Sequence, residues 1–416
     1  MTPKMRFPEF SDADRWEMTR LSDVLTEHGL KKSEEEVVFS VSVNKGLVNQ
    51  IEHLGRSFSA SNTDRYNRVH PGDIVYTKSP TGDFPFGIVK QSRLDQSVIV
   101  SPLYGVFTPK TLGLGTLLES YFESSENTKL YLEPLIQKGA RNTININNKK
   151  FLSGELPLPQ SDSEQKKIGI FLDSIDELIK FNTQKLNELH TYKKGLIQQI
   201  FPAENETTPK IRFPEFRNSG NWVNRKVSDL LRKTSNPVNV EDDEYYREIG
   251  IKSHGKGIFH KDQIKGKTLG NKRVFKVEKD LLILNIVFAW ELAVAKTSAA
   301  EEGMIASHRF PMYKPYKERS DVTYMKYFFL TEKGKELLWI ASPGGAGRNK
   351  TLGQKEFEKL EFLIPESLNE QQRIAGFLSS IDALVDLQVH KLNELKSYKK
   401  GLIQKILPVM DDFTNE

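Results

Sequence analysis

The chain of 416 residues is predicted to be an α+β protein, with two α/β domains in a tandem repeat separated by two long helices. Two observations predict this fold. Segments of the first half return 206 residues later, and between those segments the two halves differ almost completely. We therefore expect two copies of one fold related by a pseudo-two-fold axis, with the helices forming an antiparallel coiled coil.

The repeat is clearest at the start of each half and in one long segment of each half. Residues 2–10 return as residues 208–216 with a single change, from Met5 to Ile211. Residues 164–202 and 370–408 share 23 identities in 39 positions. Each half is long enough to bury a core of its own. We expect four parts, which are residues 1–155, 156–205, 206–361 and 362–416.

The long repeated segments are predicted to be helices. Ser161 and Glu164 have the spacing of a capping box at the start of the first helix, which is expected over residues 162–200. Pro202 and Pro408 close the two segments, because proline cannot continue a helix.

Apolar residues in both segments alternate at spacings of three and four, which is typical of a coiled-coil seam. The predicted seam contains Ile175, Ile179, Asn182, Leu186 and Leu189 in the first helix, and Ile381, Val385, Gln388, Leu392 and Leu395 in the second. Asn182 and Gln388 interrupt the seam at matching places, where they either fix the register or face solvent. The partner of each helix is the other copy or, alternatively, a second chain.

The inserts between the repeated segments, residues 26–150 and 232–356, have short β-rich runs separated by Gly and Pro. Residues 74–76 and 281–284 are examples of predicted strands. A few similar residues still match between the two inserts at the offset of 206, for example Ser101 with Ser307 and Pro109 with Pro315. We therefore expect the inserts to share a fold. Aromatic pairs at residues 121–122 and 327–328 are predicted to lie on a core-packing helix in each insert.

Composition limits the class of protein. With 38% hydrophobic and 28% charged residues, the chain is expected to be globular and soluble. The absence of cysteine excludes disulfides and thiolate metal sites. No apolar run is long enough to span a membrane, and the N-terminus has no signal-peptide pattern. We therefore expect a cytoplasmic protein with no membrane partner.

Basic residues are concentrated in the second insert. The formal net charge of the whole chain is only +5, but residues 247–279 contain 10 basic and 3 acidic residues. Such a run is either a solvated face or a surface for nucleic acid.

Three features together resemble the specificity (S) subunit of type I restriction-modification enzymes. They are the repeated Arg-Phe-Pro-Glu-Phe segment at residues 6–10 and 212–216, the two unlike inserts and the two near-identical helices. Residues 305–311 and 342–349 also resemble segments of that family's target-recognition domains. The resemblance implies that each domain reads one half of a bipartite, asymmetric site in double-stranded DNA. It also implies that the helices set the spacer and dock two modification subunits, to which restriction subunits add.

The resemblance further implies a non-catalytic chain without cofactors of its own. S-adenosylmethionine, ATP and Mg are expected on the partner subunits, which methylate adenine, translocate and cut.

Side chains suited to phosphates and base edges are Arg, Lys, Asn and Gln. The candidates in the first insert are Arg56, Arg65, Asn67, Arg68, Lys78, Arg141 and Asn142. Those in the second insert are Lys252, Lys256, Lys265, Lys267, Arg348, Asn349 and Lys350.

Two other classes of protein are alternatives. A chain with its own nuclease or methyltransferase activity is disfavoured: Gly266-Lys267-Thr268 resembles the end of a P-loop, but Lys261 stands where the first glycine is required. Residues 394–396 fit part of a nuclease motif but belong to the heptad helix, and the eight histidines lack metal-ligand spacing. We expect no catalytic residue and no metal. A coiled-coil scaffold that binds only proteins is the second alternative.

Overall fold

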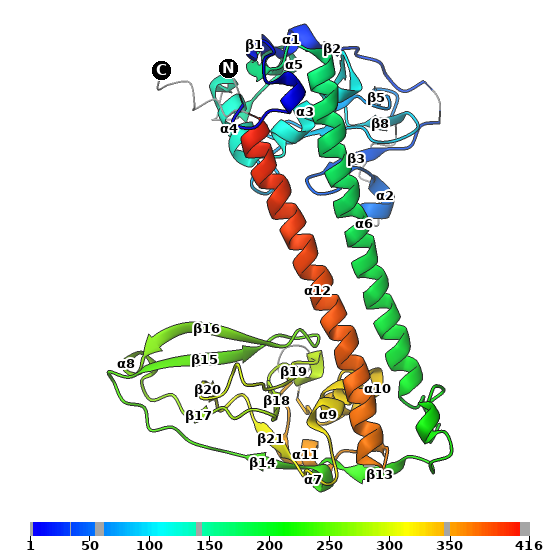
Figure 1. Cartoon of the computed structure of the whole chain (residues 1–416), viewed down its shortest axis with the longest axis vertical. Helices are drawn as coiled ribbons and strands as arrows, with labels where there is room; N and C mark the ends of the chain where they lie inside the picture. Colours follow the sequence, from blue (N-terminus) through cyan, green and yellow to red (C-terminus); the bar gives the residue numbers. More distant parts are fainter. Residues whose placement is uncertain (1–2, 34, 55–61, 139–143, 345–349, 408–416) are drawn as a thin grey trace. The chain divides into compact units, whose positions relative to one another are not determined.

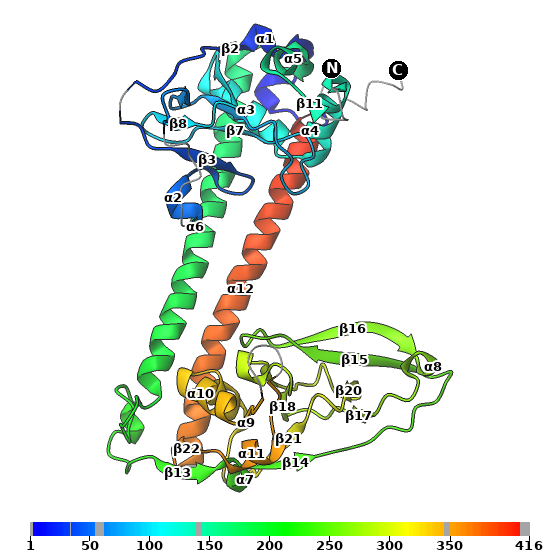
Figure 2. The ribbon, with the colours of Figure 1, turned by 180° about the vertical axis from the view of Figure 1, so that it is seen from behind.

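The computed structural model describes residues 3–33, 35–54, 62–138, 144–344 and 350–407 (Figures 1 and 2). The chain divides into two compact units. Unit 1 consists of residues 1–184 and 390–416, and unit 2 of residues 185–389. Each unit combines one α/β domain with parts of both long helices, so the two units are described in turn.

The α/β domain of unit 1 is built on an antiparallel sheet with the strand order β2-β9-β6-β7. Its strands are β2 (Leu25–Glu27), β9 (Gly105–Pro109), β6 (Ile74–Tyr76) and β7 (Val89–Gln91). Two further pairs join β3 (Phe39–Ser42) to β4 (Gly46–Asn49), and β5 (Asn67–Val69) to β8 (Val98–Val100). All three residues of β6 and of β8 are buried, which explains why their sequences are continuously apolar.

Helices α3 (Leu112–Phe122), α4 (Ser125–Leu132) and α5 (Asn148–Ser153) complete this domain. Thr111 caps α3 by accepting a hydrogen bond from the Leu114 amide at 3.1 Å. The aromatic pair at residues 121–122 lies buried on α3, as predicted. At the start of α3, a Cβ on Gly113 would lie 2.7 Å from the Lys166 Cα. Glycine is therefore required where α3 crosses the long helix.

The α/β domain of unit 2 has the same strand order in its main sheet, β14-β21-β18-β19. These strands are β14 (Leu231–Thr234), β21 (Met312–Pro315), β18 (Leu282–Leu284) and β19 (Val294–Lys296). A second sheet has the order β16-β15-β20-β17, with β16 (Ile258–Lys265), β15 (Tyr245–Ile251), β20 (Ile305–Ser307) and β17 (Val274–Lys276). The two inserts therefore share a fold, as predicted, although β15 and β16 are longer than β3 and β4.

Helices α9 (Val322–Phe329), α10 (Glu332–Ile340) and α11 (Gln354–Lys359) cover the main sheet of unit 2. The second aromatic pair, Tyr327 and Phe328, lies buried on α9. The remaining elements of both units are short: η1 (Pro8–Phe10), α1 (Leu21–Val24), α2 (Gln50–Leu54), η2 (Glu133–Leu135), β10 (Gln137–Lys138), β11 (Ile144–Asn145), η4 (Pro214–Phe216), α7 (Val227–Leu230), α8 (Gly266–Leu269) and η5 (Ala289–Glu291).

A short antiparallel pair leads into each long helix. β1 (Glu17–Arg20) pairs with β12 (Glu155–Leu158), and β13 (Val223–Lys226) pairs with β22 (Glu361–Ile364). The long helices that follow are α6 (Asp162–Ile200) and α12 (Leu368–Ile406), each of 39 residues. The predicted range of the first helix is confirmed.

A buried carboxylate ties the start of each long helix to the first residues of the same repeat, residues 3–16 or 209–222, which we call the entry segment. The Arg6 guanidinium donates to both oxygens of Glu164 at 2.7 Å, and Trp16 Nε1 donates to Oε1 at 3.2 Å. Arg212, Trp222 and Glu370 repeat this arrangement at 2.7, 2.7 and 3.3 Å.

The capping box predicted at residues 161–164 is present only in part. Ser161 Oγ accepts a hydrogen bond from the Glu164 amide at 3.4 Å, but the Glu164 carboxylate is turned to Arg6 and Trp16. A charged guanidinium is a stronger partner for a buried carboxylate than a backbone amide, so the tertiary contact takes the side chain.

The long helices run in opposite directions within each unit, as Figures 1 and 2 show. In unit 1, Ile168 and Leu172 of α6 share one core with Leu402 and Ile406 of α12. In unit 2, Ile200 of α6 shares a core with Ile374 and Leu378 of α12. Each helix therefore pairs with the other helix of the same chain, and the predicted antiparallel coiled coil is confirmed.

Every predicted seam residue is buried or half-buried. The buried ones are Ile175, Asn182, Ile381, Val385, Gln388 and Leu392, and the half-buried ones are Ile179, Leu186, Leu189 and Leu395. Asn182 and Gln388 do not face solvent, since only 1% and 6% of their surfaces are exposed. The Asn182 amide donates to the Leu178 carbonyl at 2.7 Å, which satisfies one of its buried polar atoms.

We predict that Glu164→Ala lowers the free energy of unfolding by about 3–5 kcal/mol, because it leaves the Arg6 charge buried without its partner. Chemical denaturation of the purified chain measures this loss. Glu9→Ala is the matched control: Glu9 also binds a cation, Lys167 at 3.1 Å, but this pair is about half-exposed, so the loss should stay below about 1 kcal/mol. Equal losses in the two variants would contradict the assigned role of Glu164.

Candidate nucleic-acid interface

The connection between β18 and β19, residues 285–293, organises one edge of the domain in unit 2, and we call it the central loop. It contains η5 and receives backbone hydrogen bonds from a neighbouring glycine-containing segment, residues 252–257. The His254 amide donates to the Glu291 carbonyl at 2.7 Å, and the Gly255 amide donates to the Leu292 carbonyl at 2.9 Å. The central loop therefore fixes the position of residues 252–257.

Two more segments attach to the start of the central loop. The Ile286 amide donates to the Arg309 carbonyl at 3.0 Å, and the Leu352 amide donates to the Ile286 carbonyl at 2.8 Å. Residues 252–257, 308–309 and 350–352 are far apart in the sequence, yet all of them border this one loop. The structure thus attaches to one loop two segments with predicted contact residues, Lys252 and Lys256 in one and Lys350 in the other, together with Arg309, which was not predicted.

The backbone at this junction is strained. His254 and Leu292 have φ values of 61° and 62°, a left-handed conformation that is uncommon for residues other than glycine. Ser253 Oγ donates to a Glu291 carboxylate oxygen at 3.1 Å and helps to hold the loop in this shape. Backbone strain of this kind costs of order 1–3 kcal/mol per residue and is concentrated at functional sites.

The side chains around the central loop are mainly basic. Lys252, Lys256 and Arg309 are exposed, and Lys350 is half-buried. The carboxylate on the central loop, Glu291, is bonded to Ser253. This edge therefore presents several cations together, which is a property of surfaces that bind phosphates.

Lys265 and Lys267, also predicted to contact DNA, lie elsewhere. Lys265 pairs in register with Tyr245 at the end of the β15–β16 hairpin that is opposite to residues 252–257. Its ammonium lies 3.8 Å from Asp243 Oδ1. Lys267 is exposed on α8, at the same far end of the hairpin (Figure 1). These two lysines therefore do not join the central loop.

In unit 1, the predicted contact residues are less available. Asn67 accepts a hydrogen bond from Lys31 and donates to the Tyr104 carbonyl at 2.8 Å. The Arg68 guanidinium binds Glu36 at 2.7 Å and Ser33 at 2.6 Å. Asn67 and Arg68 thus stabilise the domain, whereas Arg65 is exposed.

Lys78 lies at the start of the β6–β7 connection, which is the counterpart of the central loop in the strand order. It has a φ of 59°, so this connection also begins with a left-handed residue. Burial lowers the pKa of the Lys78 ammonium, and Glu27 only partly offsets that effect. The remaining predicted residues, Arg56, Arg141, Asn142, Arg348 and Asn349, lie outside the described part of the chain.

Two tryptophans that the sequence did not single out also border the central loop. Trp290 lies on the loop itself and Trp339 on α10, with ring centroids 5.8 Å apart. The sequence does contain a sign that these tryptophans are specific to the second insert. At the repeat offset of 206, the matching residues of the first insert are Phe84 and Glu133, so neither tryptophan is repeated.

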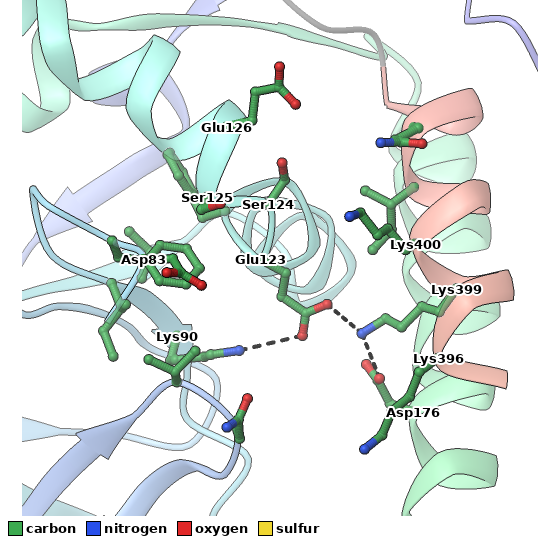
Figure 3. Close-up of a pocket in the computed structure, with 18 of the residues that line it drawn as sticks. Asp83, Lys90, Glu123, Ser124, Ser125, Glu126, Asp176, Lys396, Lys399 and Lys400 are labelled. Atoms are coloured by element: carbon green, nitrogen blue, oxygen red, sulfur yellow. Dashed lines mark hydrogen bonds and ion pairs between the residues drawn. The ribbon is translucent and has the colours of Figure 1, made fainter. Parts of the chain in front are cut away.

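A lysine on the seam of each unit binds carboxylates, which the heptad pattern did not predict. In unit 1, the Lys399 ammonium of α12 bridges Glu123, at 2.5 Å, and Asp176 of α6, at 2.6 Å (Figure 3). These residues line a pocket of about 540 Å³ together with Lys90, whose ammonium lies 3.4 Å from Glu123. Burial opposes the charge of Glu123, but Lys90 and Lys399 outweigh it and lower the pKa of this carboxyl.

Unit 2 contains the equivalent lysine, Lys193, with different neighbours. Lys193 binds Asp382 of α12, and the Tyr327 hydroxyl donates to the same carboxylate at 2.6 Å. Burial opposes ionisation of Asp382, yet hydrogen bonds from Lys193 and Tyr327 outweigh it and lower its pKa.

Each unit also exposes the same three apolar positions on the long helices. Unit 1 exposes Leu178, Phe181 and Tyr398, and unit 2 exposes their counterparts Leu384, Leu387 and Tyr192. Phe181 and Leu387 are 64% and 67% exposed, although they lie on helices that bury a seam. Large exposed apolar side chains that recur in both repeats indicate a surface for protein partners.

The described residues contain no cluster of three or more His, Asp or Glu arranged to hold a metal ion. Among the helices of the described residues, none is both long and apolar enough to cross a membrane.

Comparison with known families decides where this chain belongs. The family model for the type I restriction modification DNA specificity domain matches residues 14–191 and again residues 195–397. The chain belongs to this specificity family. The two matches follow the repeat, so each half contributes one specificity domain.

Individual relatives agree with this membership. The chain is 24% identical over 282 residues to a Methanocaldococcus jannaschii protein assigned as the specificity subunit of the type I restriction enzyme MjaX. That match covers 65% of this chain and 63% of the relative's length. The crystal structure of a type I restriction-modification S subunit from M. genitalium superposes with a TM-score of 0.61. The superposition covers 99% of this chain and 100% of the S subunit, with 12% sequence identity. The two proteins therefore share a fold.

In this specificity-family chain, we predict that Lys193→Met reduces stability at pH 7 by about 1–2 kcal/mol, because Asp382 loses a charge-assisted hydrogen bond. The pKa of Asp382 is lowered in the fold, so the unfolded chain binds this proton more readily. The contribution is therefore complete above the unfolded pKa of about 3.9 and is lost as the pH falls through the folded value.

Chemical denaturation at pH 7 and near pH 3 measures this dependence. The difference between Lys193→Met and the wild type should shrink at the lower pH. Lys194→Met, at the exposed neighbouring lysine, should change stability little at either pH. A difference for Lys193→Met that is the same at both pH values would contradict the role assigned to Asp382.

Proposed function

We propose that this chain is the DNA sequence-recognition subunit of a type I restriction-modification complex. Each α/β domain reads one half of a bipartite, asymmetric DNA site. The observation that carries the proposal is the convergence of basic segments on the central loop of unit 2, in a chain whose two halves both match a DNA specificity domain.

The chemistry of the central-loop edge suits duplex DNA. Lys252, Lys256 and Arg309 supply exposed cations for phosphates and for guanine edges in the major groove. The main sheet of unit 1 has the same strand order as that of unit 2, but the loops at its equivalent edge differ in sequence from those of unit 2. Two domains with one framework and different loops would read different sequences, which fits an asymmetric site.

The paired helices suit the roles of spacer and docking surface. A helix pair with a buried heptad seam has a length that cannot change without breaking seam contacts. The repeated exposed residues, with Phe181 in unit 1 and Leu387 in unit 2, favour two copies of one partner, and we propose that these are the two modification subunits. Restriction subunits would join that complex.

The chain itself is proposed to be non-catalytic and cytoplasmic. S-adenosylmethionine, ATP and Mg would belong to the modification and restriction subunits. We also propose the four-part division into residues 1–155, 156–205, 206–361 and 362–416, in which the domains carry recognition and the helices carry assembly. A scaffold that binds only proteins would not need the basic edge around the central loop.

For DNA recognition, we predict that Lys252→Ala combined with Lys256→Ala weakens binding of the assembled complex to its methylation site by about 10–100-fold. Each lost phosphate contact should lower the slope of log affinity against log salt by about 0.9, so the slope should fall by about 1.8. A titration of labelled duplex at several salt concentrations measures both effects.

Lys359→Ala is the matched control, because Lys359 is an exposed lysine on α11 that binds Glu356 at 2.9 Å. It should leave affinity and salt slope unchanged. If the double variant also bound DNA with the wild-type affinity and slope, the central-loop edge would not be the DNA-binding surface of unit 2.

For assembly, we predict that Phe181→Glu and Leu387→Glu each remove one of two modification subunits, because a charge replaces an apolar contact at only one of the two repeated surfaces. Native mass spectrometry of the reconstituted complex should then show one partner copy for each single variant and none for the double variant. Asn187→Glu, which adds the same charge at another exposed position of α6, should retain both copies. Full assembly of the double variant would place the docking surface elsewhere.

A further inference from the structure

We propose that Trp339, supported by Trp290 and Lys350, is an aromatic DNA contact that unit 2 has and unit 1 lacks. In the bound state, the indole of Trp339 packs against the sugar and base of a nucleotide while Lys350 binds the adjacent phosphate. This inference rests on the proposed function, since it assumes that the central-loop edge faces duplex DNA.

The exposure of Trp339 is the first observation. It is 49% exposed, and the next residue, Ile340, is 60% exposed. The repeated tryptophans Trp16 and Trp222 are 2% and 3% exposed, because they bind the buried carboxylates of Glu164 and Glu370. A large indole left half-exposed at the surface is typical of a contact site, because its ring is apolar and its N–H is polar.

The second observation is that the ring is held in place before any ligand arrives. Trp290 Nε1 donates to the Val287 carbonyl at 3.1 Å, which fixes the Trp290 ring on the central loop. The two indoles meet edge to face, with an angle of 78° between their planes. Helix α10, which carries Trp339, is capped by Thr331, whose Oγ1 accepts from the Gly334 amide at 3.0 Å. A rigid aromatic ring loses little conformational freedom when it binds.

The third observation is the position of Lys350. Its ammonium lies 3.6 Å from the centroid of the Trp339 ring. A cation–π contact at an exposed site is weak, whereas a charged hydrogen bond to phosphate is stronger. A phosphate would therefore draw Lys350 away from the ring and uncover a face of the indole beside the DNA backbone.

Charge and asymmetry together favour DNA over a protein as the occupant. The neighbouring basic residues Lys252, Lys256 and Arg309 border the same central loop. A surface for two copies of one protein would recur in both units, as the exposed helix residues do. The counterparts of Trp290 and Trp339 are instead the buried Phe84 and the exposed acid Glu133. Two unlike half-sites, by contrast, are compatible with an aromatic contact in only one domain.

The test uses the full chain labelled with 5-fluorotryptophan, assembled with unlabelled modification subunits and titrated with a duplex that contains the methylation site. The chain has four tryptophans, and Trp339→Phe assigns one fluorine resonance to Trp339. We expect the duplex to shift that resonance and to leave those of Trp16 and Trp222 in place. The inference is overturned if the duplex binds without shifting it, or if only the modification subunits shift it, which would indicate a protein contact.

Affinity measurements give a second readout. Trp339→Ala should weaken binding about 5–30-fold, because the apolar contact of the indole with DNA is lost, and should leave the salt slope unchanged. Trp339→Phe should recover most of the affinity, because its ring retains an apolar face for the contact. Lys350→Ala should lower the salt slope by about 0.9. Ile340→Ala, at the exposed neighbour, should bind DNA as the wild type does.

Several outcomes separate this inference from the proposed function. If the wild-type complex binds no duplex at all, the proposed function fails. If it binds the duplex and Trp339→Ala binds equally well, only the aromatic contact is wrong. Should Trp339→Ala misfold, Trp339→Phe and the fluorine shift of the wild-type chain still decide the matter.

Discussion

The buried carboxylates of Glu164 and Glu370 are the contacts on which the arrangement of each repeat depends. Each one joins the start of a long helix to an arginine and a tryptophan of the entry segment, 158 and 148 residues away along the chain. A buried carboxylate without these partners would be costly, so the helix can begin only where the entry segment meets it. The insert is enclosed between these two fixed points, and its loops can differ without moving the frame.

The seam lysines show how one frame accepts two unlike domains. Lys399 and Lys193 occupy equivalent positions and bind the equivalent carboxylates Asp176 and Asp382. The domains supply further partners that differ. Unit 1 supplies the Glu123 carboxylate, which binds Lys399, and unit 2 supplies the Tyr327 hydroxyl and the Lys326 ammonium, which both contact Asp382. The helix pair thus offers one polar anchor that each domain completes with its own chemistry.

The central loop connects the fold of unit 2 to its proposed role. The backbone hydrogen bonds of the loop attach three separate segments that carry basic residues, and the junction contains two left-handed residues, Leu292 on the loop and His254 beside it. The loop joins two strands, β18 and β19, that are buried except at Lys296. In unit 1 the same connection has other residues, and Arg68 and Asn67 are used for internal contacts. Identical strand order therefore does not give the two domains identical binding surfaces.

The sequence by itself determined the repeat, the two long helices, their buried heptad seams and the shared β-rich inserts. These features depend on local periodicity and on identities at a constant offset, both of which are visible along the chain. Only the tertiary structure decided which segments with basic residues border the same loop, because the backbone hydrogen bonds of residues 254–255, Arg309 and Leu352 to the central loop depend on strand order and loop conformation. It also decided that Asn67 and Arg68 are held within unit 1, that Lys265 lies at the far end of a hairpin and that Trp339 stands exposed. Spacing along a chain encodes helices and strands, but it contains no information on which loops a left-handed turn will bring together.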